Sequence, residues 1–246
     1  MSAAAETIDE FDVISPHVFS GDGYPHELWR RMRAESPVHY FPDSAIPYWA
    51  ITRHDHVTEI GRNPDLFLSA PKLVVNPNMV EDPNMDFERP KTLIELDNPA
   101  HRVARKLISC RFTPRALKKI HADVERIAHK IVDDLLEVEE GEVDFVETVS
   151  APLPIAVIAW LLGVPESDWG LVFDWTNRMI GFEDPEYGDR ESGQTALIEL
   201  FTYFAKLVEE KRAKPADDLI TLFTQAEVGG KKLEMMEILA WCQIIM

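Results

Sequence analysis

The stretch LDNPAHRVARKLISCRF, residues 96–112, carries the pattern that decides the fold expected for this chain. Its apolar residues recur with the period of an amphipathic helix, and Asn98 followed by Pro99 is typical of a helix start. At about 100° per residue, one side of this helix collects a core stripe. The stripe consists of Val103, Ala104, Leu107, Ile108 and Cys110.

His101 and Arg105 are four residues apart, on the border between that stripe and a solvent side with Arg102, Lys106 and Ser109. Side chains in this position can reach a partly buried ligand while the backbone stays packed. A guanidinium beside an imidazole suits a carboxylate or a phosphate, through charge-assisted hydrogen bonds. The spacing alone also allows a simpler interpretation, in which the cations only complement the helix dipole.

The basic character continues beyond this helix. Residues 101–119 hold seven Lys or Arg and no Asp or Glu, whereas the acid content of the whole chain would give about three acids there. The chain has 43 acidic against 25 basic residues and a formal charge of −18. This acid excess argues against nucleic acid or an anionic membrane as the main partner. A basic segment on such a protein indicates a specific anionic partner.

The rest of the chain is mainly helical by period. We expect a single domain over residues 1–246, with a small β-sheet near the N-terminus. The strand-like runs are 38–41 and 48–52. The expected helices are 25–35, 55–62, 99–111, 115–138, 145–162, 166–181, 191–213, 217–226 and 234–246.

A long irregular stretch, residues 69–98, is rich in proline and asparagine. Loops of this length inside compact domains commonly form a lid or a pocket wall. The apolar residues that would line a lipophilic pocket here are Leu73, Val74, Val75, Met79, Val80, Met85 and Phe87. A surface loop without that role is the alternative.

Targeting and metal signals are weak. The start of the chain lacks the basic and apolar regions of a signal peptide, which favours a cytoplasmic protein. The uncharged stretch 148–165 contains two internal prolines and falls short of the ~20 apolar residues of a membrane span. Cys110 and Cys242 are expected to be reduced packing residues. In His54-Asp55-His56, Asp55 is interpreted as a helix cap rather than part of a metal site.

The sequence LDNPAHRVARKLISCRFTPRAL resembles the C-helix segment of bacterial cytochromes P450, whose pattern is D-x-P-x-H-x-x-x-R-x-x-x-x-x-x-F-[ST]. The matching residues are Asp97, Pro99, His101, Arg105, Phe112 and Thr113. Further stretches resemble other parts of the family in the same order. They are YWAITRHDHVTEIGRNPDLFLS, APLPIAVIAWLLGVPESDW, MIGFEDPEYG, KPADDLITLFTQA and LEMMEILAWCQIIM, the last similar to the opening of the I-helix.

The resemblance implies the N-terminal part of the cytochrome P450 fold, in a haem-thiolate monooxygenase that uses O2 to hydroxylate a lipophilic small molecule such as a terpenoid, steroid or branched lipid. It implies that His101 and Arg105 bind the propionates of haem b. It also implies a face that docks a ferredoxin-type electron donor. That face would hold Arg102, Lys106, Arg111 and Arg115.

The family's axial cysteine loop has no counterpart in these 246 residues, and the apolar run 233–246 ends without a cap, so we expect a truncated chain. Neither Cys110 nor Cys242 stands in a glycine-containing loop that could supply the axial thiolate. This chain alone is therefore expected to be inactive, to lack catalytic and metal-ligating residues, and not to retain haem stably. The alternative is a non-catalytic, helical interaction protein derived from the family. A histidine-based hydrolase is disfavoured because no nucleophile motif accompanies the eight histidines.

Overall fold

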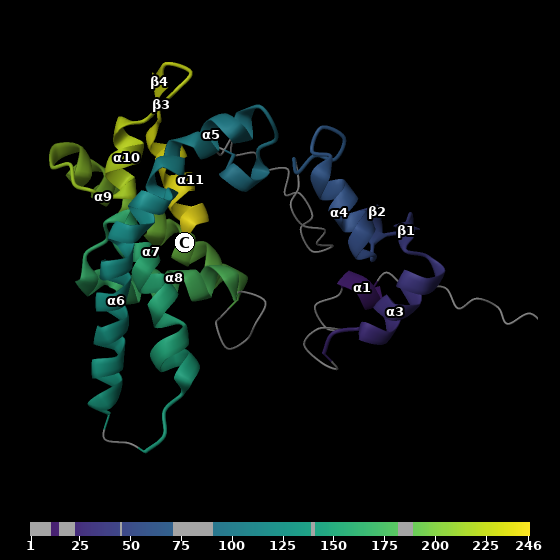
Figure 1. Ribbon diagram of the computed structural model, residues 1–246, viewed down its shortest axis with the longest axis horizontal. Coiled ribbons are helices and arrows are strands. Elements are labelled where there is room, and N and C mark those ends of the chain that lie inside the picture. The colour runs from purple at the N-terminus through teal and green to yellow at the C-terminus, as the bar shows by residue number, and fades with distance from the viewer. Residues whose placement is uncertain (1–10, 15–22, 45, 71–90, 139–140, 182–188) are drawn as a thin grey trace, which may run out of the picture. The chain divides into compact units, whose positions relative to one another are not determined.

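The computed structural model describes residues 11–14, 23–44, 46–70, 91–138, 141–181 and 189–246. The chain divides into two compact units, one of Met1–Glu88 with Ile94–Asn98 and one of Arg89–Leu93 with Pro99–Met246. Each unit is described separately below (Figure 1). The single domain expected over the whole chain stays a prediction. The apolar residues expected to line a pocket, 73 to 87, lie outside the described residues.

The first unit is built around an antiparallel hairpin. Its strands β1 (Val38–Phe41) and β2 (Tyr48–Ile51) pair with Val38 opposite Ile51 and Phe41 opposite Tyr48. Cross-strand aromatic pairs stack on this ribbon, with Phe41 and Tyr48 at a centroid distance of 4.8 Å, which is a geometry that stabilises paired strands. The remaining elements are α1 (Phe11–Ile14), α3 (His26–Glu35), α4 (His54–Arg62) and the 3-10 turn η1 (Leu93–Glu95), which ends in this unit.

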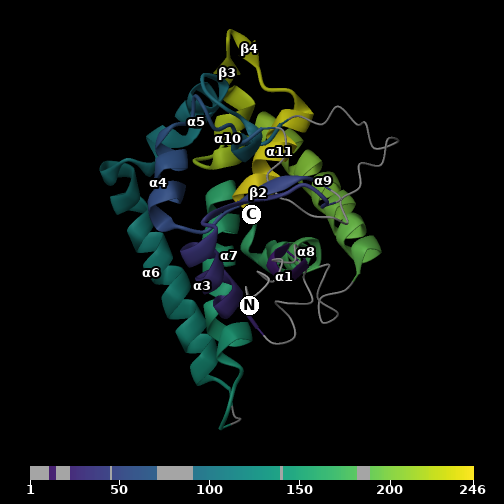
Figure 2. The ribbon, with the colours of Figure 1, turned by 90° about the vertical axis from the view of Figure 1, so that its right-hand side faces the viewer.

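The second unit is almost wholly helical. Its helices are α5 (Ala100–Ser109), α6 (Pro114–Leu136), α7 (Pro152–Leu162), α8 (Trp169–Ile180), α9 (Arg190–Ala213), α10 (Leu219–Gln225) and α11 (Met235–Ile245). Short turns precede some of them, namely η2 (Cys110–Phe112), η3 (Val146–Ser150) and η4 (Glu166–Asp168). Helices α6 and α7 lie side by side, as do α10 and α11 (Figures 1 and 2).

Side-chain caps fix where several of these helices begin. Thr113, Asp189 and Asp218 each accept a hydrogen bond from a backbone N–H in the first turn of α6, α9 and α10, which is the usual role of such residues at a helix start. Helix α11 begins with a capping box of Glu234 and Glu237. The starts of these four helices therefore follow from hydrogen bonds between a capping side chain and neighbouring backbone N–H groups.

One hydrophobic core holds the second unit together. Its fully buried large side chains include Leu162, Val172, Leu200, Phe204, Val208, Leu219, Ile220, Phe223 and Ile238. They come from α7, α8, α9, α10 and α11, so these five helices share one core. The apolar run that ends the chain is part of it, since residues 238–242 of α11 are all buried.

Most elements agree with the sequence expectation, although the expected helix 145–162 is divided into η3 and α7. Three further corrections concern α4 and α5. Asp55 does not cap α4: it is the second residue of that helix and pairs with Arg53 at 2.7 Å. Asn98 does not cap α5, whose start follows Pro99 without a side-chain cap. The core stripe is narrower than expected, because Val103 and Cys110 are exposed. Ala104, Leu107 and Ile108 do pack against the core.

A second small hairpin was not expected from the sequence. Strands β3 (Glu227–Val228) and β4 (Lys231–Lys232) pair in antiparallel fashion across Gly229 and Gly230. Both glycines have positive φ, 60° and 80°, as a two-residue hairpin turn requires. The element was missed because its strands are too short to show alternation.

The described residues hold no group of three or more His, Cys, Asp or Glu side chains that could bind a metal ion. A membrane crossing needs about 20 apolar residues in one helix, and none of the described helices meets that requirement.

Candidate functional site

Helix α5 carries His101 and Arg105, the two residues singled out by the sequence. Ala104, Leu107 and Ile108 pack against the core of the second unit, so this side of the helix is anchored. His101 is half-buried and Arg105 is exposed. His101 thus lies at the edge of the buried stripe, as expected, whereas Arg105 is exposed like the residues of the solvent side.

The side chains of His101 and Arg105 form no hydrogen bond or ion pair with another described residue. Helix α5 also has no acidic residue in its first turn. Since residues four apart on a helix are neighbours, the two side chains offer adjacent hydrogen-bond donors without an internal partner. Such a pair can bind a carboxylate from outside the described part of the chain.

Asp97, which precedes α5, has a role that the sequence analysis did not assign. Its carboxylate accepts hydrogen bonds from the backbone N–H groups of Ser69 at 2.8 Å and Ala70 at 3.0 Å. The aspartate thus ties residues 69 and 70 to residue 97 within the first unit. The only sequence signal for this role was the aspartate of the D-x-P motif. Its hydrogen-bond partners could not be inferred from local pattern, because they are 27 and 28 residues away.

The four cations expected on a partner face differ in their surroundings. Arg102 and Lys106 of α5 and Arg115 of α6 are exposed. Arg111 instead pairs with Asp217, just before α10. This guanidinium, followed by Lys119, lowers the pKa of the Asp217 carboxyl. The charge of Arg111 is therefore compensated within the protein.

A buried ion pair lies where α7, α9 and α10 meet. Asp218 is only 6% exposed; one carboxylate oxygen accepts from the Thr221 N–H at 2.7 Å and the other lies 2.5 Å from Lys211 Nζ. The side chain also fills the space beside Gly163, which ends α7 with a φ of +84°. The sequence predicted a helix start in this region but not the ion pair.

The two cysteines have different environments. Cys242 is fully buried on α11, and burial, together with the nearby Asp218 charge, raises the pKa of its thiol. A protonated thiol in an apolar core is a packing group rather than a metal ligand. Cys110 is exposed at the end of α5, and its Sγ lies 3.7 Å from the Leu107 carbonyl oxygen. It is free, but the expectation that it packs in the core was wrong.

Comparison with known proteins gives a consistent result. No protein-family model matches the chain. The chain is 36% identical over 234 residues to a steroid C26-monooxygenase of Mycobacterium tuberculosis, covering 91% of this chain and 53% of that protein. It is 31% identical over 216 residues to a methyl-branched lipid omega-hydroxylase of the same species, covering 84% of this chain and 50% of the relative. The chain thus spans about half the length of the curated relatives it matches.

Solved structures show the same relationship. A Mycobacterium marinum cytochrome P450 in complex with pseudoionone superimposes with a TM-score of 0.78 at 29% identity, covering 97% of this chain and 59% of that one. The cytochrome P450 of a Bacillus subtilis polyketide synthase gives a TM-score of 0.69 at 30% identity, covering 90% and 54%. The mainly α fold with a small antiparallel sheet is shared with these proteins. By sequence and by fold, the chain belongs to the cytochrome P450 family.

Proposed function

We propose that this chain is part of a haem-dependent monooxygenase that hydroxylates a lipophilic small molecule. The observation that carries the proposal is its 36% identity to a steroid C26-monooxygenase across 91% of the chain. A haem with an axial thiolate would supply the oxygen-activating chemistry. The residues described here would bind the cofactor and the electron donor rather than carry out that chemistry.

His101 and Arg105 fit the propionate groups of haem b. The guanidinium of Arg105 can donate two parallel hydrogen bonds to one carboxylate. The imidazole of His101 can donate one N–H to the other. Both side chains lack a partner among the described residues, and the helix that carries them is packed on the core. Their role would be to hold and orient the cofactor edge.

The substrate proposal rests on the relatives. Steroids and methyl-branched lipids appear in the names of the relatives described above, and both are apolar molecules with branched carbon skeletons. We therefore favour a steroid or branched lipid over a polar metabolite. The pocket wall expected between residues 73 and 87 and the cytoplasmic location stay predictions.

We further propose that the exposed cations near α5 dock an acidic donor of the ferredoxin type. Arg102, Lys106 and Arg115 present uncompensated charge at the surface. Arg111 would contribute less, because Asp217 already pairs with it. Docking through exposed charges is screened by salt, so electron transfer from the donor should slow as ionic strength rises.

The proposed function is tested with protein expressed from the complete reading frame that contains this sequence. The purified protein is reduced and treated with CO, and its absorbance is compared with that of the reduced sample. A thiolate-type shift of the Soret band is the expected result. A haem-bound protein without that shift would contradict the proposal. Absence of bound haem after reconstitution would favour the non-catalytic interaction protein instead.

A further inference from the structure

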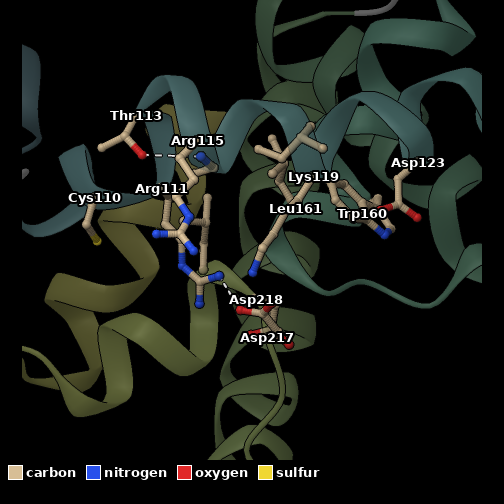
Figure 3. A pocket seen from close by; sticks show the side chains of 13 residues that line it. Cys110, Arg111, Thr113, Arg115, Lys119, Asp123, Trp160, Leu161, Asp217 and Asp218 are labelled. Carbon is tan, nitrogen blue, oxygen red and sulfur yellow. Dashed lines mark hydrogen bonds and ion pairs between the residues drawn. The ribbon is translucent and has the colours of Figure 1, made fainter.

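A pocket of about 430 Å³ lies in the second unit, between the start of α6, the end of α7 and the start of α10 (Figure 3). Its volume falls within the range of about 300–1,000 Å³ that is usual for small-molecule sites. It is built only from residues between Cys110 and Leu219. The candidate haem-propionate residues His101 and Arg105 do not line it.

One part of the pocket is apolar. Ile120 of α6 and Trp160 and Leu161 of α7 contribute to its wall, and Figure 3 shows Trp160 and Leu161 on the side of the pocket opposite Cys110. The flat indole and the branched leucine side chain can pack against a flat apolar group of a ligand.

The other part of the pocket is charged, and its wall holds three cations, Arg111, Arg115 and Lys119, and three carboxylates, Asp123, Asp217 and Asp218. Two of these carboxylates have a cation of their own, because Asp217 pairs with Arg111 and Asp218 pairs with Lys211. Asp123 lies 3.9 Å from Arg126, which is closer to Glu166 at 3.6 Å. These pairs leave the remaining two cations of the wall without an ion pair to a described residue.

Those remaining cations are Arg115 and Lys119, one turn apart on α6. Neither side chain forms an ion pair or hydrogen bond with a described residue. Lys119 extends toward the aspartates (Figure 3) and contributes to the lowered pKa of Asp217, but less than Arg111 does. The N-terminus of α6, capped by Thr113, adds its partial positive charge on the same side.

We propose that this pocket binds a small molecule that joins a phosphate or carboxylate to a flat apolar ring. The anionic group lies between Arg115 and Lys119, and the ring packs against Trp160 and Leu161. Two cations on adjacent turns can each donate a charge-assisted hydrogen bond to one anionic group. The inference goes beyond the proposed function, since binding here needs neither haem nor an electron donor. Arg115 belongs both to this pocket and to the proposed donor face.

The test titrates the full chain with phenyl phosphate, and separately with benzoate, by isothermal calorimetry. Saturable binding of either compound, with one site per chain, is expected, and inorganic phosphate should bind more weakly because it lacks the ring. The double variant Arg115→Gln with Lys119→Gln should weaken binding by at least about tenfold, since two charge-assisted hydrogen bonds are lost. The control is Lys118→Gln, which removes one positive charge from α6 at an exposed residue outside the pocket and is matched to Arg115→Gln alone.

Unchanged affinity in the double variant, equal weakening in the control, or inorganic phosphate binding as tightly as phenyl phosphate would each overturn the proposal. Circular dichroism verifies folding; if the double variant unfolds, Arg115→Gln alone should still weaken binding. Ligand binding should also change the tryptophan fluorescence of the unmodified chain, because Trp160 lines the pocket. Trp160→Phe removes this indole and should abolish that change. Because these measurements need no haem, their failure would leave the proposed function untouched.

Discussion

Gly163 and Asp218 fit so closely that the aspartate side chain occupies the space that a Cβ on the glycine would need. A Cβ built at Gly163 lies 2.8 Å from the Asp218 Cβ, and closer still to the carboxylate. The glycine also has a φ of +84°, which L side chains rarely adopt. This contact joins the end of α7 to the start of α10.

Gly163→Ala is therefore expected to destabilise the protein by about 2–4 kcal/mol, through backbone strain and overpacking. The free energy of unfolding from urea denaturation measures the effect. Gly170→Ala on α8 is the control, because nothing lies within 4 Å of its Cβ and its φ is not positive. That variant should be neutral or slightly more stable. Equal stability of the two variants would contradict the packing described.

The buried pair of Lys211 and Asp218 gives a second prediction. Lys211→Met leaves the Asp218 carboxylate, whose side chain is 5% exposed, without its cation. Removing one partner of a buried ion pair costs about 3–5 kcal/mol. Asp218→Asn, which can still cap α10, should recover part of that loss when combined with Lys211→Met. A double-mutant cycle in urea measures the coupling, and strictly additive effects would show that the pair does not interact.

A third prediction concerns acid stability. Tyr203 Oη donates to Asp168 Oδ2 at 2.7 Å, and this bond, followed by one from Ser167, lowers the Asp168 pKa below its usual 3.8. Because the pKa of Asp168 is lower in the folded state than in the unfolded state, its ionised carboxylate stabilises the protein at any pH above the unfolded-state pKa. This stabilisation is lost as the pH falls through the lower, folded-state pKa.

Tyr203→Phe should therefore raise the Asp168 pKa and reduce stability near neutral pH more than in strong acid. The pKa is read from the carboxyl carbon shift of Asp168 during an NMR titration. Tyr40→Phe is the control, because Tyr40 is exposed and stacks on Trp49 in the other unit. An unchanged Asp168 titration in Tyr203→Phe would show that the hydrogen bond does not form in solution.

Much of the fold could be predicted from local pattern. Strand β1 has the predicted bounds, and α6, α9 and α11 begin within one residue of their predicted starts, because caps and prolines act on neighbouring residues. The exposure of Cys110 was not predicted, because the helical period was applied as if the α-helix continued through this residue. The chain tightens there into the 3-10 turn η2, whose three residues per turn change the direction of the side chains.

The site was predictable only in part. The position of His101 and Arg105 on one side of α5 follows from their four-residue spacing. The pairing of Arg111 with Asp217 spans 106 residues of sequence, and no local pattern indicates it. The same holds for the contact between Asp218 and Gly163, which depends on how α7 and α10 pack. Local signals thus indicated α5 as the candidate ligand-binding helix, but not the compensation of its neighbouring charges.

The central claim is that His101 and Arg105 hold the haem propionates, and it is tested most directly by the rate of haem loss. Protein from the complete reading frame is loaded with haem, and transfer to an excess of haem-scavenging apoprotein is followed by absorbance. The double variant His101→Ala with Arg105→Ala should lose haem at least about tenfold faster, because charge-assisted hydrogen bonds are removed. Arg102→Ala, an exposed cation on the same helix, should lose haem at the unmodified rate. Equal rates for all three folded proteins would contradict the account.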